Sequence, residues 1–115
     1  MNATAIAAPI VPGRLDQWKA FSRELQEGPR HNEYAAFMKK CGLSRIRCWL
    51  QETPQGATGI ILYEGETPME FVRQMGTSQE PFALWFREKV KEYNGFDLSG
   101  PTGPPPELVT DVRAT

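Results

Sequence analysis

The feature that most constrains the fold is a pair of adjacent strands with a broken amphipathic helix on each side. Residues Ser44–Gln51 alternate between apolar and polar side chains, which predicts a strand with one buried face. A turn around Pro54-Gln55-Gly56 separates this strand from a second β-prone run, Thr58–Glu64, so the two runs predict a hairpin. An isolated hairpin is marginal in water, so the flanking segments must cover its apolar face.

The segment before the hairpin predicts two helices in succession. Apolar side chains recur at helical spacing over Leu15–Gln26, which predicts an amphipathic helix there. Gly28 and Pro29 interrupt it, and Pro29 suits the first turn of a second helix. Gly42 then predicts the C-terminal cap of that second helix.

The segment after the hairpin repeats this plan. The sequence Thr67-Pro68-Met69-Glu70 has the spacing of a capping box, with a proline at the first helical position. A break at Gly76-Thr77-Ser78 precedes another helix, predicted over Pro81–Tyr93 and closed by Asn94-Gly95. Each half of the chain therefore carries a broken helix.

The two ends of the chain complete the predicted fold. Thr4–Ile10 is β-prone, and the Pro/Gly-rich connection at 99–107 leads to Leu108–Arg113, which alternates enough for a short last strand. A disordered tail is the alternative for this last segment. With the strand, the order is βαββαβ, which predicts an α+β, ferredoxin-like fold whose four-stranded antiparallel sheet has its first and third strands at the centre.

Composition places the chain among ordinary globular proteins. Its 115 residues fit one domain, 1–115, and 40% apolar with 23% charged residues is the usual range. Thirteen basic against fourteen acidic residues give a net charge of −1, which argues against nucleic acid as a partner. Two cysteines and one histidine predict no metal site and no cofactor. The uncharged stretch Met1–Gly13 is too short to span a bilayer and lacks the features of a signal peptide, so we expect no membrane partner and a cytoplasmic location.

The sheet face that the helices leave uncovered predicts a partner. With Ile6, Ala8, Ile10, Ile46, Cys48, Leu50, Ile60 and Leu62 toward the helices, the opposite face would carry the following residues. They are Ala5, Ala7, Pro9, Arg45, Arg47, Trp49, Gln51, Gly59, Ile61 and Tyr63. Exposed apolar patches usually mark an interface or a ligand site, so packing two such faces together in a homodimer is expected.

The distribution of side-chain sizes on that face predicts a cleft. Small residues, Ala5, Ala7 and Gly59, would lie at its centre, surrounded by long side chains that end in polar groups. Such a face favours a cavity for an anionic or aromatic small molecule, bounded by Arg45 and Arg47. The alternative is an ordinary edge strand whose arginines discourage pairing with other chains.

The element order, the broken helices and the Pro-rich run before a last strand resemble the dimeric α/β-barrel superfamily. Gly42–Gln51 and Pro81–Leu98, including Pro81-Phe82-Ala83-Leu84-Trp85-Phe86, are also similar to a small bacterial family of unknown function within it. The resemblance implies a dimeric barrel. It also implies the small-molecule chemistry of members such as cofactor-independent monooxygenases, lactone isomerases and haem-degrading proteins.

Two functional hypotheses follow for the predicted face. In the first, a monooxygenase or isomerase would bind its substrate through Arg45, Arg47, Trp49 and Gln51, with His31 and Tyr63 as candidate catalytic residues. Histidine is the side chain whose ordinary pKa lies near neutrality, so His31 is the candidate base. In the second hypothesis the chain is a non-catalytic dimeric binding or interaction module, and the same face mainly forms the dimer.

Overall fold

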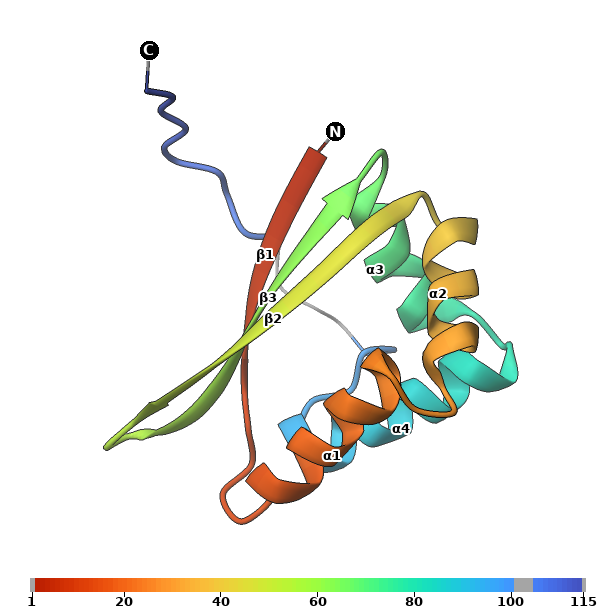
Figure 1. Cartoon of the computed structure of the whole chain (residues 1–115), viewed down its shortest axis with the longest axis vertical. Helices are drawn as coiled ribbons and strands as arrows, with labels where there is room; N and C mark the ends of the chain where they lie inside the picture. The colour runs from red at the N-terminus through yellow and green to blue at the C-terminus, as the bar shows by residue number, and fades with distance from the viewer. Residues whose placement is uncertain (1, 101–104, 115) are drawn as a thin grey trace.

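The computed structural model describes residues 2–100 and 105–114, and the ordered elements come in the sequence strand, two helices, two strands, two helices (Figure 1). Their bounds are β1 Asn2–Pro9, α1 Leu15–Gln26, α2 His31–Lys40, β2 Leu43–Thr53, β3 Gly56–Gly65, α3 Pro68–Thr77 and α4 Pro81–Asn94. The protein is therefore an α+β fold in which a β2–β3 hairpin separates two pairs of helices, as the sequence predicts. Among the described residues, no helix has the length and apolar character needed to cross a bilayer.

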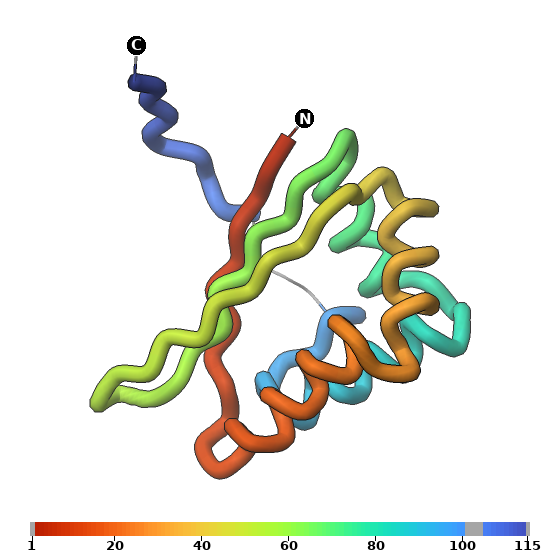
Figure 2. The backbone as a smooth tube through the Cα atoms, in the orientation of Figure 1, coloured from red at the N-terminus to blue at the C-terminus, as the bar shows by residue number. Residues whose placement is uncertain are grey.

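The sheet has three antiparallel strands in the order β1-β3-β2. The central strand, β3, pairs along almost its whole length with both neighbours, so that Ile61 lies between Ile6 on β1 and Cys48 on β2. All four helices lie on one side of this twisted sheet (Figure 1). The far end of the β2–β3 hairpin extends beyond them (Figure 2).

The predicted fourth strand is wrong, and with it the βαββαβ order. Residues 105–114 have no strand or helix in the structure, and every one of them is exposed. In the described part of the chain no fourth strand lies beside β1, so β1 is an edge of the sheet and β3 is the central strand. Alternation in Leu108–Arg113 gives a preference for extended backbone, but a six-residue strand is stable only when a neighbouring strand and an apolar layer hold it. Part of the predicted connection, residues 101–104, lies outside the described residues.

The predicted face of β3 is also wrong. The register places Gly59, Ile61 and Tyr63 toward the helices, in rows with Leu50, Cys48 and Ile46. The sequence of this strand is apolar at consecutive positions, so alternation cannot tell its two faces apart. The close approach of α1 sets the face, because a Cβ on Gly59 would lie 2.8 Å from Cζ2 of Trp18.

The helix boundaries follow local signals with two exceptions. α1 has the predicted bounds, α3 and α4 begin at Pro68 and Pro81, and Gly95 ends α4 with a φ of 77°. α2 begins at His31, two residues after the predicted proline. The predicted capping box at Thr67 is wrong, because its hydroxyl instead donates to the carbonyl oxygen of Cys41 at 2.9 Å. Thr67 therefore joins the start of α3 to the end of α2.

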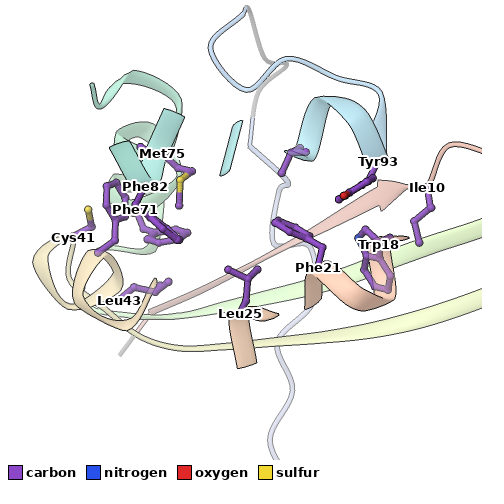
Figure 3. Packing of buried hydrophobic residues seen from close by; sticks show 13 residues of the cluster. Ile10, Trp18, Phe21, Leu25, Cys41, Leu43, Phe71, Met75, Phe82 and Tyr93 are labelled. Atoms are coloured by element: carbon purple, nitrogen blue, oxygen red, sulfur yellow. The ribbon is translucent and has the colours of Figure 1, made fainter. Parts of the chain in front are cut away.

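Aromatic side chains dominate the core between the sheet and the helices. Phe71 lies with Phe82 and Met75 near the α2–β2 connection, while Phe21 and Trp18 pack farther along the sheet (Figure 3). The rings interlock at centroid distances typical of favourable aromatic pairs, for example 5.9 Å between Phe37 and Phe71. This cluster is continuous, which fixes α1 and α2 over the inner face of the sheet.

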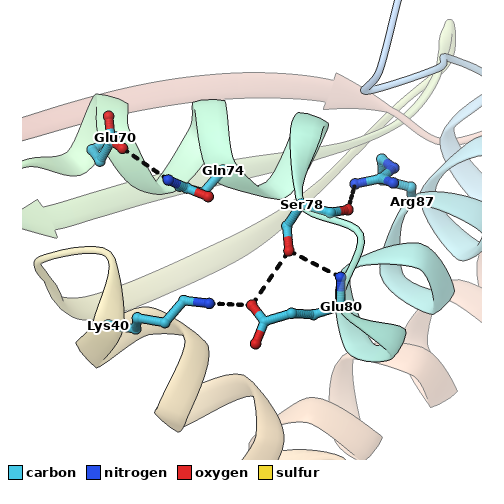
Figure 4. A network of polar contacts seen from close by, with 6 residues as sticks. All are labelled: Lys40, Glu70, Gln74, Ser78, Glu80 and Arg87. Carbon is cyan, nitrogen blue, oxygen red and sulfur yellow. Dashed lines mark hydrogen bonds and ion pairs between the residues drawn. The ribbon is translucent and has the colours of Figure 1, made fainter.

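Polar contacts join the helix ends at the surface of this core. The guanidinium of Arg87 on α4 donates to the carbonyl oxygens of Met75 and Ser78, both at 2.8 Å, where α3 ends. Lys40 at the end of α2 pairs with Glu80 at the start of α4, and the Ser78 hydroxyl contacts the same carboxylate (Figure 4). The Arg87 hydrogen bonds satisfy carbonyl groups at the end of α3, and together with the Lys40–Glu80 pair they hold α2, α3 and α4 together.

Candidate functional site

A cavity of about 800 Å³ lies between the helix pair α1–α2 and the edge strand β2. It is lined by seven consecutive residues of β2, Ser44–Leu50, and by residues of α1 and α2 that face this strand. We call this cavity the cleft. It exists because β2 has no neighbouring strand on its outer side within the described residues, and because α1 and α2 do not cover that side completely. Cys48 is therefore exposed although its side chain is on the helix side of the sheet.

The rim of the cleft is positively charged. Lys19 and Arg23 come from α1, and Arg45 and Arg47 come from β2. None of the described residues that line the cleft is an aspartate or glutamate, although the chain has more acidic than basic residues. Arg45 and Arg47 alternate along β2 with inward-facing residues, so they reach the rim from the outer side of this edge strand.

Arg47 has spare hydrogen-bonding capacity at this rim. Its Nη2 donates to Oε1 of Glu64 at 2.8 Å, and its guanidinium carbon lies 5.6 Å from the ring centroid of Trp49. Its Nε is buried and has no hydrogen-bond partner among the residues that the structure describes. Buried N–H groups are almost always paired in folded proteins, so this donor marks a place where an acceptor would be stabilised.

His31 lies at the start of α2 and lines the cleft, and a contact with the backbone fixes one of its two ring nitrogens. Its Nδ1 is 3.1 Å from the carbonyl oxygen of Leu25. A carbonyl can only accept, so Nδ1 carries the hydrogen and the neutral imidazole has its lone pair on Nε2. The side chain can thus accept a hydrogen bond or a proton from a molecule in the cleft.

Next to the cleft, toward the sheet, lies an apolar pocket of about 130 Å³, which we call the inner pocket. The two cavities share Trp18, Ser22, Leu25, Tyr34 and Cys48. Beyond these residues the inner pocket reaches core side chains of β3 and α3. The site therefore has a cationic entrance and an apolar, partly aromatic end.

The ionisable groups deep in the site remain protonated. Burial raises the pKa of Tyr34 well above its ordinary value, and burial, with a smaller effect of Cys48, also raises the pKa of Tyr63. Burial likewise raises the pKa of the Cys48 thiol. These groups can donate hydrogen bonds at neutral pH but do not accept protons. Within the described part of the chain, no group of three or more His, Cys, Asp or Glu side chains is placed to hold a metal ion.

The thiol of Cys48 is expected to react slowly in spite of its exposure. Only the thiolate is nucleophilic, and the raised pKa keeps this form scarce at pH 7.5. Alkylation by iodoacetamide, followed by peptide mapping, should be slower at Cys48 than in a short unstructured peptide containing one cysteine. Its rate should continue to rise with pH above 9. A rate at pH 7.5 equal to that of the peptide would contradict this description of the site.

The structure brings together four of the six predicted site residues. His31, Arg45, Arg47 and Trp49 all line the cleft. Tyr63 does not lie on the outer face as predicted but in the core, where its ring is 5.7 Å from that of Phe71 and lines the inner pocket. Gln51 is exposed beyond the end of the cleft. The predicted central hollow around Gly59 is also wrong, since Gly59 faces Trp18 and the outer face has Ile60 and Leu62 at its centre.

Several lining residues were missed from the sequence. Trp18 and Tyr34 lie on helical apolar stripes, which predict core positions and give no sign of a cavity. Arg23 is adjacent to the stripe of α1, and its position beside β2 depends on how the helix packs.

Comparison of the chain with known protein families, with curated proteins and with solved structures gives no match.

Proposed function

We propose that the chain binds a small organic anion with an apolar, preferably aromatic, body in the cleft. The observation that carries this proposal is the charge of the entrance, where Lys19, Arg23, Arg45 and Arg47 gather with no carboxylate among the described lining residues. A volume of about 800 Å³ is in the range of pockets that hold small molecules. An acidic group at the rim would pair with these cations.

The interior favours the apolar part of such a molecule. Trp18 and Tyr34 offer aromatic surface where the cleft meets the inner pocket, and the inner pocket beyond them is mostly apolar. His31 can accept a hydrogen bond through Nε2 from a hydroxyl or acidic C–H group of the ligand. This arrangement supports ligand binding in the cleft. For a ligand that is also a substrate, the arrangement supports proton transfer from the bound molecule to His31.

Titration with 1-naphthoate, followed by calorimetry and by tryptophan fluorescence, tests this proposal. We expect saturable binding of 1-naphthoate and at least about tenfold weaker binding of the neutral analogue 1-naphthalenemethanol, because hydrogen bonds to charged groups contribute about 1.5–3 kcal/mol. Arg23→Gln should weaken naphthoate binding by about tenfold or more for the same reason. Lys39→Gln removes one positive charge from exposed surface of α2 outside the cleft and serves as the matched control.

The outcomes distinguish binding in the cleft from nonspecific attraction of the anion to positive charges elsewhere on the protein. Loss of affinity in Arg23→Gln but not in Lys39→Gln supports the cleft, provided that both variants keep the circular dichroism spectrum of the wild type. The proposal fails if naphthoate does not bind saturably, if the neutral analogue binds equally well, or if both variants lose affinity to the same extent.

A further inference from the structure

The inner pocket is lined by two tyrosines whose hydroxyl groups have no hydrogen-bond partner among the described residues. Tyr34 comes from α2 and Tyr63 from β3, and their rings lie 6.3 and 5.7 Å from the ring of Phe71. Burial is the main cause of the raised pKa of Tyr34, and the nearness of Tyr63 and then of Cys48 adds to it. Two phenols from different elements therefore lie close together at one place in the core.

Packing alone does not account for these hydroxyl groups. A phenylalanine would fill the same space, and it would not place a polar group without a partner in an apolar pocket. A hydroxyl that is removed from water and left unpaired lowers stability, and buried polar groups in folded proteins almost always have a partner. Asn94, which also lines the inner pocket, follows this rule, because its Nδ2 donates to the carbonyl oxygen of Pro9 at 2.9 Å. The unpaired phenols indicate an acceptor that comes from a bound molecule.

The surroundings of the phenols favour an uncharged acceptor. None of the described residues that line the inner pocket carries a charge, so an ionised carboxylate would lose its hydration there without a cation to replace it. The raised pKa values keep both phenols protonated at neutral pH, so both can donate. An apolar cavity of about 150 Å³ can hold benzene, so the inner pocket, at about 130 Å³, has room for a small group with a carbonyl oxygen.

We infer that the ligand of the cleft has, at the end opposite its acid group, a neutral carbonyl oxygen that accepts hydrogen bonds from Tyr34 and Tyr63. The inference rests on the proposed function, in which the cations of the rim hold the acid group. Tyr34 and Cys48 line both cavities, so a molecule that extends past them from the cleft enters the inner pocket. The ligand class is therefore a keto acid whose acid and carbonyl groups are separated by an apolar body.

Pairs of acids that differ only in the carbonyl group test this inference by calorimetry. The first pair is 4-acetylbenzoate and 4-isopropylbenzoate, and the second is the same pair built on biphenyl-4-carboxylate with the substituent at the far end. The two members of a pair have the same charge and nearly the same shape, and the two pairs cover two distances between the acid and the carbonyl. In at least one pair we expect the ketone to bind about tenfold more tightly, because it satisfies two donors that the isopropyl group leaves unpaired.

Substitution of the tyrosines by phenylalanine removes the hydroxyl groups and keeps the rings. In Tyr34→Phe/Tyr63→Phe the preference for the ketone should disappear, and the carbonyl stretching band of the bound ketone should move to higher wavenumber than in the wild type. Removal of unpaired hydroxyls should not lower the urea midpoint of the free protein. Tyr93→Phe is the matched control, because it removes the remaining tyrosine hydroxyl of the chain from a position that lines neither cavity, and it should keep the preference.

The outcomes distinguish this inference from the proposed function. A preference for the ketone that is lost in the double variant and kept in Tyr93→Phe supports the inference. If the ketone and its isopropyl analogue bind equally well in both pairs, the carbonyl site is refuted while the anion site stands. A preference that persists in the double variant also refutes the carbonyl site. If none of the four acids binds saturably, the proposed function fails and this inference fails with it.

Discussion

Replacing Phe71 with alanine is expected to lower the free energy of unfolding by about 3–5 kcal/mol, the usual cost of removing a buried phenylalanine ring. The side chain is 2% exposed, the lowest exposure of any ring in the core. It contacts the rings of Tyr34, Phe37 and Tyr63, which come from α2 and β3. The cavity would thus open where α2, α3 and the sheet meet, and no single helix could shift to fill it without losing other contacts.

Urea denaturation followed by circular dichroism measures this effect. Leu84→Ala is the matched control, because it also removes a large apolar side chain from a helix but at a position that is 44% exposed. We expect the control to lose no more than about 1 kcal/mol. A loss in Phe71→Ala similar to that of the control would show that the ring is not a central part of the core.

Gly65→Ala is expected to cost about 3 kcal/mol, at the upper end of the range for overpacking a tight site. A Cβ at this position would lie 2.4 Å from the carbonyl oxygen of Gly42 and 2.8 Å from Cα of Leu43. Both are backbone atoms, so the added methyl group cannot be accommodated by rotating a side chain. The end of β3 and the start of β2 would have to separate, which would also disturb the hydrogen bond from the Thr67 amide to the Gly42 carbonyl.

Thermal unfolding of Gly65→Ala, compared with Gly100→Ala, tests this expectation. A Cβ on Gly100 would have its nearest neighbour, the carbonyl oxygen of Asp97, at 3.4 Å, an ordinary contact. A large fall in melting temperature is therefore expected only for the Gly65 variant. Equal melting temperatures in the two variants would mean that β2 and β3 can separate at this end with little loss.

The helices and the hairpin could be predicted from the sequence because their signals are local. Pro68, Pro81 and Gly95 mark helix ends by their own backbone preferences, and the structure confirms all three. The fourth strand and the face of β3 could not be predicted in this way. A short strand depends on a neighbour that the alternation of Leu108–Arg113 does not provide, and the face of β3 depends on the contact of Gly59 with Trp18 from another element.

In the candidate site, too, local patterns could be predicted from the sequence, whereas contacts between distant elements could not. The alternation of residues along β2 correctly placed Arg45, Arg47 and Trp49 on the same face of this strand, and these residues line the cleft. The predicted hollow of small residues at the centre of the outer face depended on the face of β3, and this part of the prediction is wrong. For this reason Tyr63, which was predicted on the outer face, lies in the core. Arg23 lines the cleft because of how α1 packs beside β2, and no local sequence pattern predicts that packing.

The pairing of the N-terminal strand only with β3 has a consequence for the order of folding. The β2–β3 hairpin joins residues that are neighbours in the sequence, whereas the pairs between β1 and β3 run from Pro9–Thr58 to Asn2–Gly65. Closing a long loop costs more entropy than closing a short one, and non-local contacts slow folding. We therefore expect β1 to dock late in refolding. During synthesis on the ribosome, β1 then waits for a partner strand that is made about half the length of this chain later, and it becomes ordered only after that strand has emerged.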